Sequence, residues 1–205
     1  MENLPEQKQI SFFGELLRKT THMFSLVIPV SYYLLDASKY EMLRFLIPAT
    51  ILMILIDVSR LMNLTFWEKF GANCFKVMIR KHESEGDFTG ATYILTSFCL
   101  TISLFEKHIA IAALSFIIVG DTFAALIGRR FGRHKFWNKS WEGSFACLAG
   151  TVIVALLVPS LTLTVALFGA VVAAVTEALP FGIDDNLTVP LVSGTAMMIL
   201  SHFSI

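Results

Sequence analysis

Charge is scarce in this sequence. Lys, Arg, Asp and Glu together make up 16% of the 205 residues, whereas soluble domains average about 25%. The formal net charge is zero, so there is no basic surface of the kind that binds nucleic acid, and we expect no nucleic-acid partner. Hydrophobic residues make up 55% and gather in long runs. This composition argues against a soluble domain and predicts a multi-pass membrane protein.

Several familiar motifs are also missing. The three cysteines, Cys74, Cys99 and Cys147, lack the spacing of a metal site, so we expect them to act as small apolar residues. The sequence contains neither a Walker A motif nor the protein-kinase signatures, so a bound nucleotide would need another scheme. The first nine residues are polar and no small-residue cleavage site follows them, so no cleaved leader is expected.

The apolar runs predict an all-α fold with about seven membrane-spanning helices. Ahead of them, residues 11–22 predict an amphipathic helix, because Glu15, Arg18, Lys19 and His22 fall on one helical face. Two interpretations of this polar face stay open: a solvated face of an interfacial helix, or a face directed at a phosphate or at the main site. The predicted spans are 21–36, 42–62, 89–105, 108–128, 142–159, 161–178 and 187–204.

Most Lys and Arg residues lie in the N-terminal segment, in the connection 63–88 and in the loop after residue 128. The positive-inside rule therefore predicts that the N-terminus and these connections are cytoplasmic and that the C-terminus is outside, in a bacterial cytoplasmic membrane. The connection 63–88 also predicts an interfacial cytoplasmic helix. We expect one integral membrane domain over 1–205, with an amphipathic segment 1–20 and a helical bundle 21–205 that carries active-site loops 129–141 and 178–187.

The stretch from Val119 to Ser144 combines a carboxylate at membrane depth with a cationic loop. Asp121 follows twelve uncharged residues, and ionisable residues inside membrane segments are costly and usually functional. Arg and Lys suit phosphate, glycines let a ligand approach the backbone, and a serine can cap the next helix and favour anions there. These residues are Arg129, Arg130, Arg133, Lys135 and Lys139; Gly128, Gly132 and Gly143; and Ser140 or Ser144.

Further carboxylates approach the same predicted side, and hard oxygen ligands suit Mg²⁺ together with substrate phosphates. With Asp121 they predict phosphoryl or nucleotidyl transfer to a membrane lipid, with Asp121 or Asp185 as general base. The acids after residue 176 could instead form a solvated loop, and Asp57 could simply pair with Arg60. The additional carboxylates are Glu142, Glu177, Asp184 and Asp185.

Three blocks carry the central motifs: G-D-T-F-A-A-L-I-G-R-R-F-G-R-H-K, N-K-S-W-E-G-S and E-A-L-P-F-G-I-D-D-N-L-T-V-P. With the N-terminal E-L-L-R-K-T-T-H and the later F-T-G-A-T-Y, they resemble the polyprenol kinase family, which includes dolichol kinase, phytol kinase and the CTP-dependent diacylglycerol kinase of yeast. The resemblance implies transfer of the γ-phosphate of CTP, with a divalent metal, to the hydroxyl of a polyprenol, a phytol-like alcohol or diacylglycerol.

By position, the resemblance implies roles for individual residues. Asp121, Asp185 and Lys139 would act in catalysis, Arg18, Lys19 and His22 would face the substrate, and Thr188 and Pro190 would shape the return into the membrane. The nucleotide would contact Gly128, Arg129, Gly132, Lys135, Lys139, Ser140, Glu142, Gly143 and Asn186, and Mg²⁺ would contact Asp121, Glu177, Asp184 and Asp185.

The same blocks are distantly similar to phosphatidate cytidylyltransferase, which also uses CTP. This chain ends in D-D-N-L-T-V-P-L-V-S-G and lacks that enzyme's P-G-H-G-G-x-x-D-R-x-D signature, which favours a kinase. An ion-coupled transporter is a third alternative, but no inverted repeat is visible. We expect a membrane lipid and a nucleoside triphosphate as ligands, and homo-oligomer formation stays open.

Overall fold

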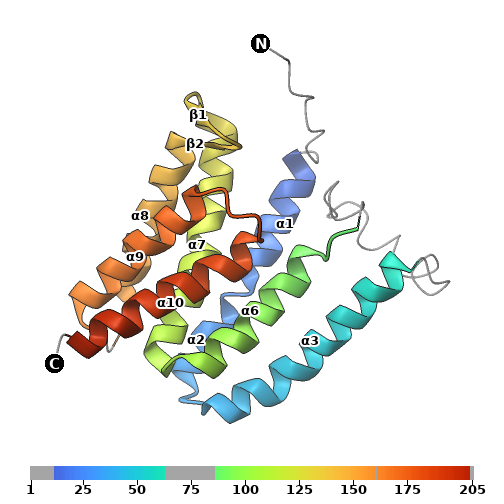
Figure 1. The fold of residues 1–205 in the computed structure, drawn as a ribbon, viewed down its shortest axis with the longest axis vertical. Helices are drawn as coiled ribbons and strands as arrows, with labels where there is room; N and C mark the ends of the chain where they lie inside the picture. The colour runs from blue at the N-terminus through green and yellow to red at the C-terminus, as the bar shows by residue number, and fades with distance from the viewer. Residues whose placement is uncertain (1–11, 63–85, 160, 204–205) are drawn as a thin grey trace.

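The structure, a computed structural model, describes residues 12–62, 86–159 and 161–203. Within them the chain is almost entirely helical, and the helices form one bundle with a short hairpin at one end (Figure 1). The predicted all-α class is therefore confirmed. The elements are α1 (Phe12–Phe24), α2 (Val27–Leu34), α3 (Lys39–Leu61), α6 (Gly90–Leu104), α7 (Lys107–Phe131), β1 (Lys135–Phe136), β2 (Lys139–Ser140), α8 (Trp141–Leu157), α9 (Leu163–Ala178) and α10 (Asp185–Phe203).

Each predicted span from 42–62 onward coincides with one helix, with ends that shift by a few residues. The first predicted span does not form one helix, because α1 ends at Phe24 and the eight-residue α2 begins at Val27. Among the described residues, α3 and α7 are the two helices long and apolar enough to cross a membrane. Most of the predicted interfacial helix within 63–88 lies outside the described residues.

Local chemistry explains where several helices begin. α3 starts with a capping box, in which the Ser38 hydroxyl accepts from the Glu41 N–H at 3.3 Å and the Glu41 carboxylate accepts from the Ser38 N–H at 2.7 Å. α8 starts at Ser140, whose hydroxyl accepts from the Gly143 N–H at 3.2 Å. The prediction that a serine caps this helix is confirmed for Ser140.

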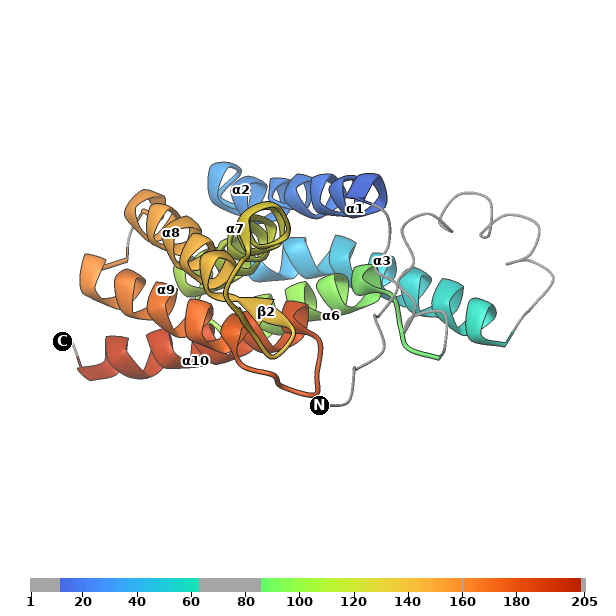
Figure 2. The same ribbon diagram turned by 90° about the horizontal axis from the view of Figure 1, so that it is seen from above.

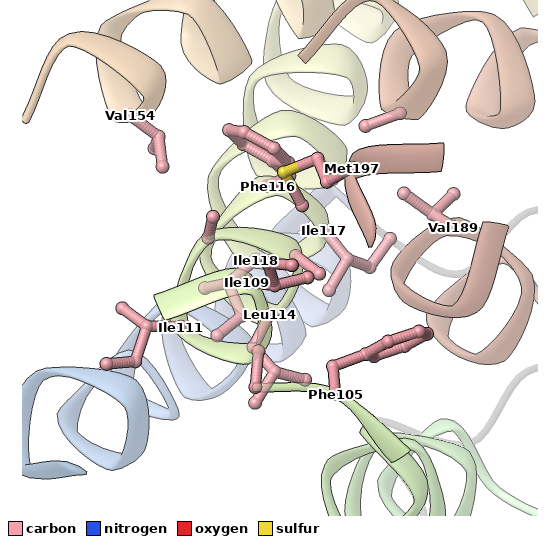
Figure 3. Close-up of a cluster of buried hydrophobic side chains, with 14 of the residues drawn as sticks. Phe105, Ile109, Ile111, Leu114, Phe116, Ile117, Ile118, Val154, Val189 and Met197 are labelled. Carbon is pink, nitrogen blue, oxygen red and sulfur yellow. The ribbon is translucent and has the colours of Figure 1, made fainter. Parts of the chain in front are cut away.

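α7 is the central helix of the bundle. It packs most extensively on α8 and also contacts α1, α2, α6, α9 and α10. Viewed from above, α7 lies between the α1–α2 pair and the α9–α10 pair (Figure 2). Its segment from Ile109 to Ile118 is buried throughout, and Figure 3 shows these side chains beside Val154 of α8 and Met197 of α10. At 1.5 Å per residue, α7 is roughly 37 Å long, enough for a hydrocarbon core of about 30 Å.

α3 lies at the edge of the bundle, where it packs on α6 (Figure 1). Phe45, Ile51 and Leu55 are among the large apolar side chains that it exposes. A contiguous apolar face of this size is unfavourable in water and normal against lipid. Together with the length of α3 and α7, this face indicates a membrane protein.

Candidate active site

The polar residues singled out in the sequence gather at the end of the bundle that carries the hairpin. The hairpin, the N-terminal end of α1 and the C-terminal end of α7 lie toward the top of Figure 1, whereas the C-terminus and the start of α3 lie toward the bottom. At the bottom end, Lys107 pairs with Asp36 at 2.5 Å and ties the start of α7 to the chain after α2. The candidate catalytic groups therefore lie at the hairpin end.

One cluster joins α1 to α7. The Lys19 ammonium donates to Asp121 Oδ2, and the Nε2 of His22 lies 3.6 Å from the same oxygen. Lys19 is 1% exposed and His22 is also buried, so this contact is shielded from water. The predicted polar face of α1 is thus buried against Asp121 of α7 rather than solvated. Because the charge of Asp121 is balanced by Lys19, this carboxylate is held in a fixed position.

A second ion-pair network continues along the same face of α1. Arg18 Nη2 donates to Glu15 Oε1 at 2.5 Å, and Arg129 Nη2 of α7 lies 3.6 Å from Glu15 Oε2. Burial alone would raise the pKa of Glu15, but the hydrogen bond and charge of Arg18, helped by Lys19 and Arg129, lower it below its usual value. Arg129 therefore turns toward α1, where its position is fixed by a carboxylate.

The other cluster is centred on Lys139 of β2. Its ammonium donates to Glu177 Oε1 and to Asp185 Oδ2, both at 3.0 Å, and to the backbone oxygen of Glu177. Burial opposes the charge on Lys139, but the two carboxylates outweigh it and raise the pKa of Lys139 above its usual value. Two carboxylates therefore share one ammonium here.

Three buried side-chain oxygens at this end have no hydrogen-bond partner among the described residues. They are Glu177 Oε2, Asn186 Oδ1 and the Ser144 hydroxyl, and Glu177 and Asn186 are each 5% exposed. Buried polar atoms are nearly always satisfied, so these atoms need an explanation. Acceptor oxygens of this kind fit a ligand that brings a cation or hydrogen-bond donors.

The Asp121 and Lys139 clusters are near each other. Asp121 acts electrostatically on both Glu177 and Asp185, and the buried thiol of Cys147 in α8 is within range of the charges of both clusters. Asp121 follows Lys107 by fourteen residues, which places it about 21 Å along α7 and about 15 Å from its C-terminal end. Two separately held polar clusters thus share one end of the bundle.

The glycines of the cationic stretch pack against protein atoms. A Cβ on Gly132 would lie 2.2 Å from the Gly128 backbone oxygen and 2.6 Å from Ser140 Oγ, so no larger residue fits. A Cβ on Gly143 would lie 3.3 Å from the Gly128 Cα. These three glycines therefore bring α7, α8 and the hairpin together around Ser140. In this structure their space is filled by the chain, and they support the site through packing.

The hairpin is stabilised by Glu142. Its Oε1 lies 2.8 Å from His134 Nδ1 and accepts from the His134 N–H at 3.2 Å, while the Trp141 N–H donates to the His134 oxygen at 3.0 Å. In the predicted loop 129–141, residues through Phe131 belong to α7, residues 135–140 form the hairpin, and Trp141 begins α8. Lys135 is exposed on β1. Glu142 and Lys135 are therefore farther from the buried clusters than Lys139.

Asp57 has a structural role. Its Oδ1 accepts from Arg60 Nε at 3.1 Å, and its Oδ2 accepts from the Thr89 N–H at 2.8 Å and from the Thr92 hydroxyl at 2.6 Å. Arg60 also donates to the Asp87 backbone oxygen at 2.5 Å. The predicted pairing of Asp57 with Arg60 is confirmed. This buried network fastens the end of α3 to the start of α6.

The predicted metal ligands are divided between these groups. Asp121 pairs with Lys19, Glu177 and Asp185 share Lys139, and Asp184 Oδ1 accepts from the Asn186 side chain at 2.6 Å. Across residues 12–62, 86–159 and 161–203, no group of three or more His, Cys, Asp or Glu side chains is arranged to hold a metal. The unpartnered oxygens of Glu177 and Asn186 are nevertheless hard ligands of the type that Mg²⁺ prefers beside phosphates.

Three features of this end were not predicted from the sequence: the hairpin, the Lys19–Asp121 pair and the bond from Lys139 to the Glu177 backbone. A short alternation, Lys135 to Ser140 around Trp137–Asn138, was the one available signal for the hairpin. The predicted loop 178–187 is also shorter, because α10 begins at Asp185. Asp185 and Asn186 therefore lie in the first helical turn.

With this geometry in place, comparison with known proteins identifies the family. A profile of the Cytidylyltransferase family matches residues 4–183. The chain belongs to this family. The match covers α1, the hairpin and Glu177, and it ends just before Asp184. No solved structure matches the chain.

Three relatives match nearly the whole chain. An uncharacterised protein of Rickettsia prowazekii is 28% identical, over 90% of this chain and 93% of its own length. Probable phytol kinase 1, chloroplastic, of Oryza sativa is 28% identical over 92% of this chain and 65% of its own length. CTP-dependent diacylglycerol kinase 1 of Saccharomyces cerevisiae is 26% identical over 89% of this chain and 72% of its own length. The predicted resemblance to CTP-dependent lipid kinases is confirmed.

Proposed function

We propose that this protein is a CTP-dependent lipid kinase that transfers the γ-phosphate of CTP to the hydroxyl of a membrane lipid alcohol. The observation that carries this proposal is the Lys139 cluster, in which one ammonium meets Glu177 and Asp185 and in which Glu177 Oε2 has no partner among the described residues. Relatives named phytol kinase and CTP-dependent diacylglycerol kinase support the same reaction class.

Charge balance suggests how the residues act. Lys139, Arg129 and Lys19 are three cations held in position by carboxylates, so they bind phosphates with little reorganisation. Asp121 orients Lys19. Mg²⁺, if held by Glu177 and Asn186, would neutralise charge on the phosphates of the nucleotide. Phosphoryl transfer depends on such positioning and neutralisation more than on covalent chemistry.

The proposed reaction has one bond-forming and one bond-breaking event. The lipid hydroxyl oxygen forms a bond to the γ-phosphorus, and the bond from the γ-phosphorus to the β,γ-bridging oxygen breaks and releases CDP. The hydroxyl proton passes to a carboxylate, for which Asp185 is better suited than Asp121. Asp121 has Lys19 as its own counter-ion, whereas Asp185 shares one cation with Glu177.

The membrane arrangement belongs to the same proposal. We place α6, α8, α9 and α10 in the bilayer beside α3 and α7, with the N-terminus and the hairpin on the cytoplasmic side. The concentration of cations at the hairpin end supports this orientation. The polar clusters would then lie at the cytoplasmic rim, where CTP from water and a hydroxyl on a membrane lipid can meet. Diacylglycerol, phytol-like alcohols and polyprenols all present such a hydroxyl.

The decisive experiment uses the full-length protein in nanodiscs with CTP and Mg²⁺ and a panel of these three lipid alcohols. CTP labelled at the γ-phosphate should transfer its label to one class of lipid, and CTP labelled at the α-phosphate should not. Mass analysis of the product would identify the acceptor. Absence of label on any lipid, or absence of CTP consumption, would contradict the proposal.

The alternative is a cytidylyltransferase that forms a CDP-lipid, which the family's description favours. It predicts the opposite result, because the α-phosphate of CTP would then appear in the lipid. Phosphatidic acid should be included in the panel for this reason. The kinase-type names of the two plant and yeast relatives favour γ-phosphate transfer.

A further inference from the structure

The cations of the stretch 129–139 divide into an inward and an outward set. Arg129 reaches Glu15, and Lys139 reaches Glu177. Three others are exposed, and none of them has a carboxylate partner among the described residues. These exposed cations are Arg130, Arg133 and Lys135. Of the five cations in this stretch, two therefore face the buried clusters and three lie on the outer surface of the hairpin end.

Exposed aromatic rings lie beside the outward cations. Trp137 is 65% exposed and Trp141 is 54% exposed, although indole is costly to leave in water. Phe136 links them, with ring centroids 5.6 Å from Trp137 and 4.8 Å from Trp141. The row continues to Phe145, whose ring lies 6.2 Å from that of Trp141. These four rings form one continuous row from the hairpin onto α8, which we call the aromatic row.

Trp137 has a backbone conformation that tryptophan rarely adopts. Trp137 has φ = +48°, a region that residues with a bulky side chain rarely adopt and that favours glycine or asparagine. A tryptophan therefore gives no conformational advantage at this turn. Its indole contacts the Phe136 ring but is 65% exposed, so most of its surface is open to contacts outside the chain.

The location of the aromatic row fits a membrane surface. α7 is long enough to cross the hydrocarbon core and ends at Phe131, four residues before the hairpin begins. Tryptophan is enriched at the level of the lipid headgroups, and clustered Lys and Arg there attract anionic lipids. Arg130 also lies over the Phe131 ring, 5.6 Å from its centroid. The exposed cations and the aromatic rings therefore lie on the same end of the bundle.

We propose that the hairpin 135–140, with Arg130, Arg133 and the aromatic row, docks onto the headgroup layer of a bilayer that contains anionic phospholipid. The rings enter the interface, and the outward cations contact lipid phosphates. Glu142 holds the hairpin through His134 and so fixes the row before contact. The docked hairpin positions Lys139, on its second strand, at the rim of the membrane.

The test measures the surroundings of Trp137 alone, in the full-length protein with Trp67→Phe and Trp141→Phe. In nanodiscs with phosphatidylglycerol, lipids brominated near the headgroup should quench Trp137 fluorescence strongly, and acrylamide in the water should quench it weakly. Removing phosphatidylglycerol should reverse this order. Trp137 that stays accessible to acrylamide and unquenched by brominated lipid in anionic bilayers would overturn the proposal.

Charge variants test the lipid-phosphate contact. Arg130→Gln and Arg133→Gln should each lower the ratio of membrane-inserted to water-exposed Trp137 roughly fivefold in anionic nanodiscs. Each variant loses one cation's attraction to the anionic lipid surface, which accounts for a factor of about that size. The matched control is Arg44→Gln, which removes an exposed cation from α3 at the other end of the bundle. Equal quenching in all three variants would refute the contact.

Two other outcomes would also overturn the proposal, and both are measured in detergent without phospholipid. If CTP protects Trp137 from acrylamide there, the row belongs to the nucleotide site. If protection rises with protein concentration there, a second copy of the chain covers the row. We expect no protection in either case.

Discussion

The ammonium of Lys19 in α1 meets the carboxylate of Asp121 in α7, 102 positions later in the chain. This pair fastens the amphipathic helix α1 to the central helix of the bundle. It also explains why an acid can lie part-buried in the central helix, since its charge is matched there. Removal of Asp121 would leave the Lys19 ammonium buried without its counter-ion.

Asp121→Asn should lower kcat roughly a hundredfold through misplacement of Lys19, and should destabilise the protein by about 3–5 kcal/mol because a buried ammonium loses its counter-ion. The double variant Lys19→Met, Asp121→Asn removes that unpaired charge. It should recover most of the stability and none of the activity. Thermal unfolding in detergent and CTP turnover measure the two effects. Full activity in a folded Asp121→Asn protein would contradict the assignment.

Lys139→Gln leaves Glu177 and Asp185 without their shared cation. We expect a higher KM for CTP and a lower Tm. In the wild type the raised pKa of Lys139 keeps the ammonium charged up to alkaline pH, so the Tm deficit of the variant should be fully present at about pH 8 and should shrink only when the pH rises through that pKa. A variant with the wild-type Tm at about pH 8 would argue against the charge-sharing arrangement.

Glu177→Gln tests the proposed metal contact. The variant keeps the volume of the side chain but removes a charge, so binding of Mn²⁺, used as a probe for Mg²⁺, should weaken by about tenfold or more. Electron paramagnetic resonance of free Mn²⁺ measures this without catalysis. Glu106→Gln, an exposed carboxylate at the start of α7, is the control and should bind normally. Identical binding in both variants would exclude Glu177 as a ligand.

Gly132→Ala should destabilise the hairpin end by about 1–3 kcal/mol, because the added Cβ would overlap the Gly128 backbone oxygen and Ser140. Gly182→Ala is the control, since a Cβ there meets no atom within 4 Å. Comparison of Tm for the two variants isolates the effect of packing from that of glycine replacement. A stable Gly132→Ala protein would show that α7 and the hairpin can separate at little cost.

Asp57→Asn should lower the free energy of unfolding by about 3–5 kcal/mol, because Arg60 loses its buried partner. The KM for CTP should not change, since the Asp57 network connects α3 and α6 and does not include the Lys139 cluster. Steady-state kinetics at a temperature where the variant is folded provides the measurement. A raised KM for CTP would move Asp57 into the nucleotide site.

Local patterns in the sequence were sufficient for most helices. Each span from 42–62 onward coincides with a helix because a long apolar run has one way to satisfy its backbone in a bundle. The i, i+3 spacing of Asp57 and Arg60 likewise anticipated their pairing, and Ser140 was readable as a helix cap. The break between α1 and α2 was not readable, because apolar character alone continues across Phe24 and Val27.

Composition and motifs by themselves determined that this chain is a helical membrane protein with carboxylates and cations concentrated in three blocks. Only the tertiary structure decided which of these charges meet: Lys19 with Asp121, and Lys139 with Glu177 and Asp185. The physical reason is that an ion pair depends on distance in space, and helices separated by up to 102 positions come together through packing that no local pattern encodes.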